Sequence, residues 1–316
     1  MSAPEVVTLG ETMVSLRTST PLRLGGSLAM SMAGSESNVA IGLARLGHSV
    51  RWGGRIGADE VGTFILRTLR SESVLVDTVL VDPERPTGLM LSERRISDFS
   101  RVSYYRERSA GSALSRSDVA LALAKIPHIL HVTGITPAIS ESAAAAVDWA
   151  VRHAHDLGAL VSVDVNYRAR LWSIDEARPT LSALVRSADI VIASEDELGI
   201  VVATPFDELA AAGELAEFGV RDLVIKRGAR GATVWRDSIA HHADAIRVPV
   251  LDTIGAGDAL TAGYLSGVLD GLSSATALYR GIVTASFAVA AVGDWEGLPN
   301  RDELSLLDHE SGTTFR

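Results

Sequence analysis

The stretch Asp252-Thr253-Ile254-Gly255-Ala256-Gly257-Asp258 is the most informative part of this chain. It follows an apolar run over residues 246–251, which we expect to be extended, and it opens a helical pattern that continues to Leu265. Its small residues leave backbone N–H groups accessible at the positive end of a helix dipole, a position that favours an anion such as phosphate. Asp258 adds a carboxylate to this turn. Phosphate binding does not require a carboxylate, but deprotonation of a hydroxyl that attacks the phosphate does require one.

The two standard nucleotide fingerprints do not explain this turn. A Walker loop ends in Gly-Lys-Ser/Thr, which is absent here, and the dinucleotide pattern needs a third glycine where Leu260 stands. The missing glycine also disfavours a nicotinamide-dependent oxidoreductase. On this motif alone, an ordinary strand-to-helix turn is an equal alternative to phosphate chemistry.

Composition limits the class of protein. The chain has 316 residues, of which 47% are hydrophobic and 22% charged, a balance that predicts a compact globular domain. The net charge of −10 argues against nucleic acid or an anionic membrane as a partner. The chain lacks cysteine, and it has no apolar stretch of about 18 residues, the length that spans a membrane. We therefore expect a soluble cytoplasmic protein with a single domain over residues 1–316.

Apolar runs alternate with amphipathic helical stretches over most of the length. Strands are predicted at residues 6–9, 129–132, 160–165, 190–193 and 223–226, and helices at 36–46, 142–157 and 175–185. This alternation predicts an α/β fold with a mainly parallel sheet between two helical layers. Residues from about 14–33 and 87–107 break the rhythm and predict a small antiparallel sheet, although an ordinary peripheral hairpin is an alternative.

A second motif lies at the start of a predicted helix and reads Gly34-Ser35-Glu36-Ser37-Asn38-Val39-Ala40. Asn38 is in the first turn, where its side chain can face a bound hydroxyl. Helix capping is the alternative explanation for Ser35. This motif and residues 252–258, in this order, resemble the two signatures of the ribokinase-like (phosphofructokinase-B) carbohydrate kinases. The resemblance implies a three-layer α/β/α domain with a small β-sheet lid. It also implies binding of ATP and Mg²⁺, Asp258 as the base, and phosphoryl stabilisation by the amides of Gly255, Ala256 and Gly257.

Two further segments are expected to lie near the nucleotide. Residues 226–232 are rich in glycine and cations and could form a hairpin turn; the resemblance places Lys226, Gly228 and Gly231 near ATP, together with Gly255 and Gly257. Relatives have Asn-x-x-Glu where this chain has Ser194 and Glu197, so the resemblance implies that Glu197 contacts Mg²⁺ through water. An acidic helix start is the alternative.

The remaining motifs concern the substrate. Arg106 and Arg168 each stand beside tyrosine, and two arginines over one pocket suit a carboxylate, although either could be a solvated side chain. Residues 104–114, 131–140, 164–173 and 293–299 resemble the 2-keto-3-deoxygluconate kinase subfamily. Met90 departs from the tyrosine that this subfamily can carry. The implied substrate-binding residues are Gly34, Ser35, Asn38, Met90, Tyr104, Arg106, Ile135, Arg168, Asp258 and Asp294.

The sequence thus predicts an ATP-dependent sugar-acid kinase that phosphorylates the terminal C6 hydroxyl of 2-keto-3-deoxygluconate. Fructose, ribose and 2-keto-3-deoxygalactonate stay open as substrates, and so does a catalytically silent sugar-binding sensor. The resemblance allows a homo-oligomer formed through the lid, and the sequence does not decide the number of subunits.

Overall fold

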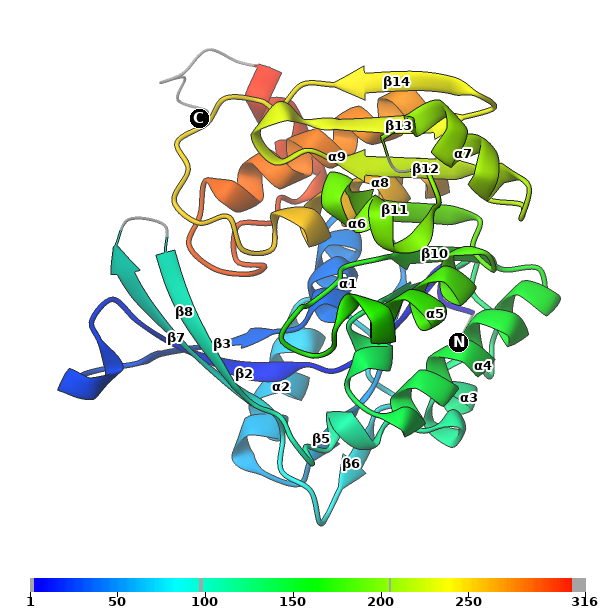
Figure 1. The fold of residues 1–316 in the computed structure, drawn as a ribbon. Helices are drawn as coiled ribbons and strands as arrows, with labels where there is room; N and C mark the ends of the chain where they lie inside the picture. Colours follow the sequence, from blue (N-terminus) through cyan, green and yellow to red (C-terminus); the bar gives the residue numbers. More distant parts are fainter. Residues whose placement is uncertain (1–2, 97–98, 205, 309–316) are drawn as a thin grey trace.

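The computed structural model describes residues 3–96, 99–204 and 206–308. Its centre is an eight-stranded sheet in the order β14-β13-β12-β11-β10-β9-β1-β4 (Figure 1). Neighbours from β4 to β12 pair in parallel, while β13 is antiparallel to β12 and to β14. In that order the strands are Ile239–Ala243, Ala232–Arg236, Asp222–Lys226, Ile190–Ser194, Leu160–Asp164, Ile129–Thr133, Val6–Leu9 and Val50–Gly53. The five predicted strands are confirmed.

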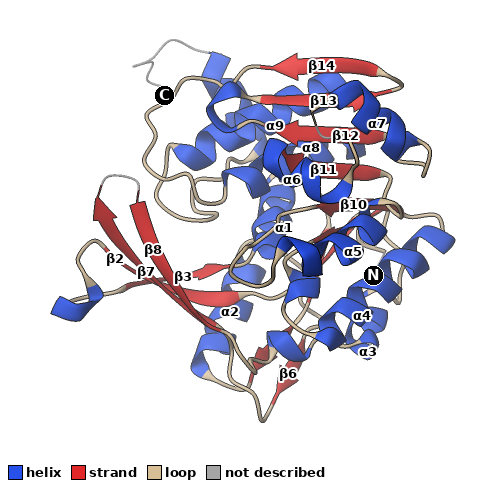
Figure 2. Cartoon of the chain, viewed as in Figure 1, coloured by secondary structure: helices blue, strands red, loops and turns tan. Residues whose placement is uncertain are grey.

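Successive residues of the central strands point to opposite faces, and both faces are buried. In β1, Val6 packs into one core cluster and Val7 into the other. Because helices cover both faces, the parallel strands read as continuous apolar runs (Figure 2). The Val6 face is covered by α1 (Ser35–Arg45), α2 (Glu60–Ser71), α8 (Ala256–Leu269) and α9 (Ser274–Val289). The opposite face is covered by α3 (Arg116–Ala122), α4 (Glu141–Asp156), α5 (Ile174–Val185), α6 (Glu195–Val201) and α7 (Glu208–Ala216).

A second sheet, here called the lid sheet, stands away from the main body (Figure 1). It contains β3 (Ala29–Ala33), β2 (Met13–Thr18), β7 (Leu89–Ile96) and β8 (Phe99–Tyr105), in that order. The prediction of a small sheet is confirmed, but its fully antiparallel form is wrong because β2 and β7 pair in parallel. Each hairpin is antiparallel, and the chain returns to the main body between them through β4, β5 (Arg55–Gly57), α2 and β6 (Leu80–Asp82). Two outgoing strands therefore lie side by side.

The apolar run before residues 252–258 was expected to be extended, and this expectation is wrong. Residues 246–251 form no strand; the chain from 244 to 250 has no regular structure. Val250 and Leu251 are about half exposed, so apolar burial contributes little free energy that would stabilise this segment as a strand of the sheet. In the described ranges, helices that combine the length and the apolar character required to cross a membrane are absent.

Candidate active site

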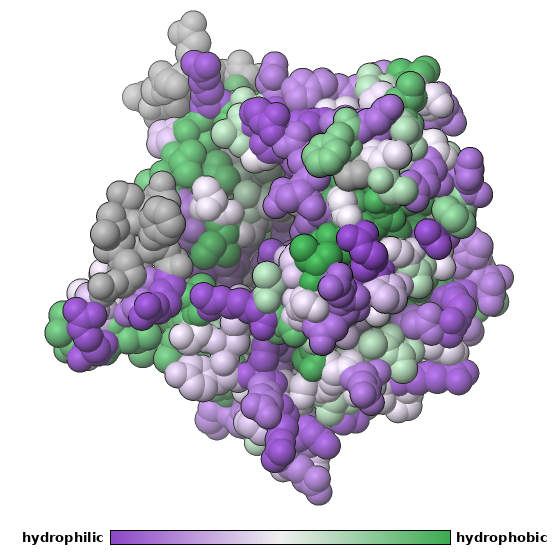
Figure 3. Space-filling view, viewed as in Figure 1, coloured by the Kyte–Doolittle hydropathy of each residue, from purple (hydrophilic) through white to green (hydrophobic). Residues whose placement is uncertain are grey.

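The carboxyl ends of the parallel strands open onto a cavity of 590 Å³ that the lid sheet also borders. The surface is hollowed at this place, between the lid sheet and the main body (Figure 3). Parallel α/β sheets commonly bind ligands at this edge. All ten residues predicted to bind substrate line the cavity: Gly34, Ser35, Asn38, Met90, Tyr104, Arg106, Ile135, Arg168, Asp258 and Asp294.

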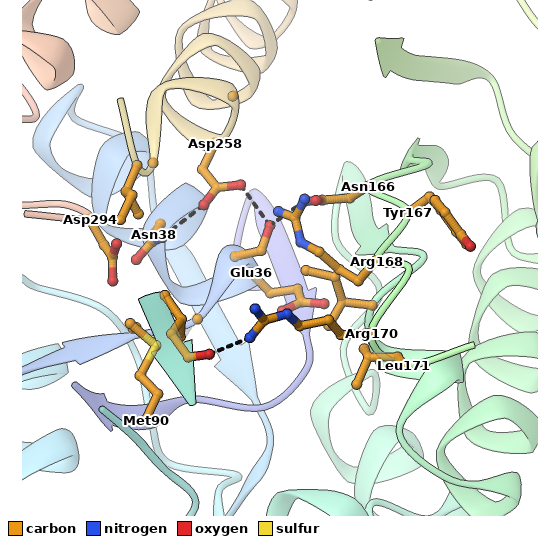
Figure 4. A pocket seen from close by; sticks show the side chains of 18 of the residues that line it. Glu36, Asn38, Met90, Asn166, Tyr167, Arg168, Arg170, Leu171, Asp258 and Asp294 are labelled. Atoms are coloured by element: carbon orange, nitrogen blue, oxygen red, sulfur yellow. Dashed lines mark hydrogen bonds between the residues drawn. The ribbon is translucent and has the colours of Figure 1, made fainter. Parts of the chain in front are cut away.

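Asp258 lies in the first turn of α8, and its carboxylate faces the cavity (Figure 4). Ser35 Oγ donates to its Oδ1 at 2.6 Å, and Asn38 Nδ2 donates to its Oδ2 at 2.8 Å. Asn166 Nδ2 in turn donates to Ser35 Oγ at 2.9 Å. Burial raises the pKa of Asp258, while the bonds from Ser35 and Asn38 lower it. The result is a carboxylate of fixed orientation with raised basicity.

These contacts correct the reading of Ser35 as a helix cap. Gly34 is the N-cap of α1 and has no side chain to offer, while the Ser35 hydroxyl is used by Asp258. Asn166 was not assigned a role from the sequence, although it lies two residues after the end of a buried strand, where many ligand-binding residues lie.

The turn before Asp258 is shaped by close backbone contacts. Gly255 is the N-cap of α8 at φ 78°, in the left-handed region, and a Cβ there would lie 2.0 Å from the carbonyl oxygen of Asp294. Glycine is therefore required on both grounds. The Ala256 amide bends back to Thr253 O at 3.4 Å, and Ala256 is absent from the cavity wall, whereas Gly255 and Gly257 line it. The first-turn amides of a helix lack partners inside the helix, so this turn suits an anion.

The two predicted arginines differ in their surroundings. Arg106 donates to the buried carboxylate of Glu11, with Nε at 2.7 Å and Nη2 at 2.6 Å, and Ser109 Oγ donates to the other oxygen at 2.5 Å. The positive charge of Arg106 is thus balanced by Glu11. Glu11 was not predicted as a site residue, although its position just after the first strand was an available signal.

Arg168 is exposed to the cavity, and its guanidinium forms no hydrogen bond or ion pair with any other residue of the described ranges; its backbone oxygen accepts from Leu171 N at 2.9 Å, and its positive charge lowers the pKa of Asp258 from a distance. Arg170 also lines the cavity and donates from Nη1 to the backbone oxygen of Val102 in the lid sheet. Figure 4 shows both side chains extending into the cavity from the segment that follows β10. Arg168 therefore offers a full positive charge with free N–H donors.

Asp294 is almost completely buried at the edge of the cavity, with 3% of its side chain exposed. Arg17 Nη2 lies 2.8 Å from its Oδ1. Burial raises the pKa of Asp294 to about 7, although the charge of Arg17 opposes the shift. The sequence offered no signal for Arg17, which lies 277 positions earlier, on the lid sheet.

Lys226 ends β12 on the side expected for the nucleotide. Its Nζ lies 2.7 and 2.8 Å from the two oxygens of Asp164. Burial would lower its pKa, but the negative charges of Asp164, Glu197 and Asp258 and the hydrogen bond to Asp164 together outweigh that effect and raise it. A Cβ on Gly257 would lie 3.7 Å from this Nζ, so the ammonium group stands beside the glycine turn. The pairing with Asp164 was not predicted.

Ser194 and Glu197 also line the cavity, and their local geometry matches the acidic helix start that was the alternative. Glu197 Oε2 accepts from the backbone of Ser194 at 2.7 Å, and Oε1 accepts from the backbone of Tyr167 at 2.8 Å. Both oxygens thus hold the protein backbone, and each keeps a second lone pair. Across the described residues, a cluster of three or more potential metal ligands is lacking.

Gly228 and Gly231 belong to the turn between β12 and β13 and are not on the cavity wall. Gly231 has φ 83°, and a Cβ there would lie 2.0 Å from the backbone oxygen of Ala243 in β14. The hairpin-turn alternative is therefore the observed local structure. Packing against β14 accounts for the glycine at 231 without a ligand.

The chain is similar to known carbohydrate kinases in sequence and in fold. The sequence profile of the pfkB family carbohydrate kinases matches residues 3–301. A Bacillus subtilis protein named 2-dehydro-3-deoxygluconokinase is 35% identical over 310 residues, covering 95% of this chain and 94% of its own. A Haloferax volcanii 2-dehydro-3-deoxygalactonokinase is 29% identical, with 92% of each chain covered.

Among solved structures, an Escherichia coli protein described as a candidate ribokinase II, in complex with ATP and Mg²⁺, has a TM-score of 0.88. Its identity is 24%, and 96% of this chain and 99% of that one are covered, so this likeness shows the fold. The family profile spans nearly the whole described chain and includes both the glycine turn and the cavity. This chain belongs to the pfkB family of carbohydrate kinases.

Proposed function

We propose that this protein transfers the γ-phosphoryl group of ATP to the C6 hydroxyl of 2-keto-3-deoxygluconate. The observation that carries the proposal is the unpaired guanidinium of Arg168 in the same cavity as the oriented carboxylate of Asp258. A guanidinium group binds a carboxylate through paired, charge-assisted hydrogen bonds. The name of the Bacillus subtilis relative supports this substrate, since 2-dehydro-3-deoxygluconate is the same compound.

Asp258 accepts the proton of the C6 hydroxyl as its oxygen forms a bond to the γ-phosphorus. The bond from that phosphorus to the bridging oxygen breaks, and the proton later leaves to water. Ser35 and Asn38 hold the carboxylate in place, so little reorganisation is needed. The raised pKa of Asp258 makes it a stronger base than an exposed aspartate.

The amides of Gly255, Ala256 and Gly257 stabilise charge on the phosphoryl oxygens, and Ala256 contributes least because its N–H already bends toward Thr253. One such donor contributes about 3 kcal/mol to lowering a barrier. When bound, ATP supplies the phosphoryl group and its Mg²⁺ offsets the triphosphate charge. The glycine turn and Lys226 fit those phosphates.

The other nucleotide contacts are also part of the proposal. Ser194 lies on the cavity wall, where it would stand beside the triphosphate, and the turn of Gly228 and Gly231 would border the nucleotide from outside the cavity. Glu197 would hold Mg²⁺ through water, with the lone pairs that its backbone contacts leave free. Mg²⁺ would arrive with ATP.

On the sugar side, Arg168 binds the carboxylate, while Gly34, Ile135 and Asp294 contact the rest of the sugar acid. Met90, Tyr104 and Arg106 form the wall on the lid side, and Met90 packs with Met13 and Ala33. This wall excludes water, which would otherwise compete with the sugar as acceptor. A methionine at position 90 provides contact area without a hydroxyl donor.

A substrate panel tests the proposal. Formation of ADP is followed with 2-keto-3-deoxygluconate, its C4 epimer 2-keto-3-deoxygalactonate, fructose and ribose, and the position of the new phosphate is read by NMR. We expect the highest kcat/KM with 2-keto-3-deoxygluconate and phosphate on C6. A preference for fructose or ribose would contradict carboxylate recognition, and sugar binding without any ADP would point to a sensor.

A further inference from the structure

Arg17 connects the lid sheet to the main body. It lies in β2, and its guanidinium contacts two loops that are far from it in sequence: Nη1 donates to Asp252 Oδ2 at 3.2 Å, and Nη2 lies 2.8 Å from Asp294 Oδ1. Ser15 Oγ, two residues earlier on the strand, accepts from Nε at 3.2 Å. Three sides of the guanidinium are thus engaged, and only 16% of the side chain is exposed.

The two loops that Arg17 joins shape the catalytic turn. Asp252 opens that turn, and its other oxygen accepts from the backbone of Ile254 at 3.1 Å. The backbone of Asp294 lies directly against Gly255, where a Cβ would be 2.0 Å from its carbonyl oxygen. The conformation of Gly255 therefore depends on how these loops lie against each other, and Arg17 binds both.

Charge supports the same arrangement. Asp252 and Asp294 place two carboxyl groups beside one guanidinium, and Asp258 and Glu296 are close enough to raise the pKa of Asp294 further. Without Arg17, the buried Asp294 would have no cation to offset its charge, and the two loops would repel each other. The lid sheet also contacts the second loop elsewhere, because Ser31 Oγ donates to Glu296 Oε1 at 2.5 Å.

We propose that Arg17 is a positioning residue that couples the lid sheet to the catalytic turn by bridging Asp252 and Asp294. The glycine turn then reaches its working geometry only when the lid sheet lies against the main body. Arg17 acts through the loops and not on the reacting atoms, so its loss should lower kcat more than it weakens binding of ATP. This inference rests on the proposed kinase activity.

The test compares Arg17→Met with Arg23→Met, a control at an exposed arginine in the connection between β2 and β3 of the same sheet. We expect Arg17→Met to lower kcat about 10-fold or more while Kd for ATP changes little, because small displacements of catalytic groups have large effects on rate. Arg23→Met should match the wild type. If the wild type phosphorylates a sugar and both variants have the same kcat as the wild type, the coupling through Arg17 is refuted. If the wild type is inactive on every sugar, the proposed function is refuted instead.

Three further variants separate positioning from folding. Asp252→Asn and the double variant Arg17→Met/Asp252→Asn complete a cycle, in which the two losses in kcat should overlap because both break one bridge. Additive losses would contradict the coupling. Arg17→Lys keeps the charge but has one terminal nitrogen, so it should fold normally and still lose about fivefold or more in kcat. Wild-type kcat in Arg17→Lys would overturn the inference even if Arg17→Met failed to fold.

Discussion

Replacement of Arg168 by glutamine tests how the substrate is recognised. The guanidinium is exposed and has no hydrogen-bonded or ion-paired partner in the described chain, so its removal breaks no ion pair; only its longer-range charge, which lowers the pKa of Asp258, is lost. Hydrogen bonds to a charged group contribute about 1.5–3 kcal/mol, which corresponds to a rise in KM for 2-keto-3-deoxygluconate of about 10- to 100-fold. The kcat should stay within a few-fold, because the carboxylate is bound equally in the ground and transition states.

Arg106→Gln provides the matched comparison for this assay. Its loss leaves Glu11 buried with 1% of its side chain exposed and without its cation, which costs about 3 kcal/mol of stability. The melting temperature should therefore fall in Arg106→Gln and stay unchanged in Arg168→Gln. Both variants are assayed with the sugar acid and with fructose. If Arg168→Gln weakens both sugars equally, or lowers the melting temperature, recognition of the carboxylate by Arg168 is refuted.

Two other substitutions test the surroundings of the turn. The folded pKa of Asp294 is raised from 3.8 to about 7, so this group contributes stability that is fully present below its unfolded pKa and is lost as pH rises to 7. The free energy of unfolding of Asp294→Asn, measured with urea, should therefore rise relative to that of the wild type as the pH increases from 4 to 7, by at most about 4 kcal/mol. If the two curves of unfolding free energy against pH are parallel, the pKa of Asp294 is not raised. Gly255→Ala should lose at least about 1–2 kcal/mol of stability and most activity, because φ is 78° and its Cβ would meet Asp294. Gly213→Ala, in α7 with open space around it, should be as stable as the wild type or slightly more so, and equal effects at both glycines would be inconsistent with strain at the turn.

The sequence was sufficient for the parts of this protein that depend on local pattern. Short apolar runs between amphipathic helical stretches located the parallel strands, and the glycine turn with Asp258 was recognisable because its residues are consecutive. The lid sheet was predicted from two half-polar segments, but the parallel pairing of β2 with β7 depends on the route of the chain between them. The run over residues 246–251 looked like a strand because pattern alone does not reveal which apolar residues stay on the surface.

The pairings within the site could not be predicted in the same way. Glu11 meets Arg106 across 95 positions, because the chain after β1 lies against the end of β8 in the lid sheet. Asp164 meets Lys226 across 62 positions, because the ends of β10 and β12 lie at the same edge of the main sheet. Such contacts decide which cations are free: Arg106 is balanced by Glu11, whereas Arg168 is not. A sequence shows the residue types but not their counter-ions, so the two arginines looked equivalent until the fold was known.

The central claim, that Asp258 takes the proton from the sugar, is tested most directly by Asp258→Asn in a rapid-quench measurement of phosphoryl transfer with ATP and 2-keto-3-deoxygluconate. Asparagine has nearly the same shape and can keep a hydrogen bond to Ser35 or Asn38, so the cavity should keep its form. We expect ATP affinity close to that of the wild type and a transfer rate lower by at least about 100-fold, the usual contribution of a general base. A transfer rate near the wild-type value would show that the proton leaves by another route.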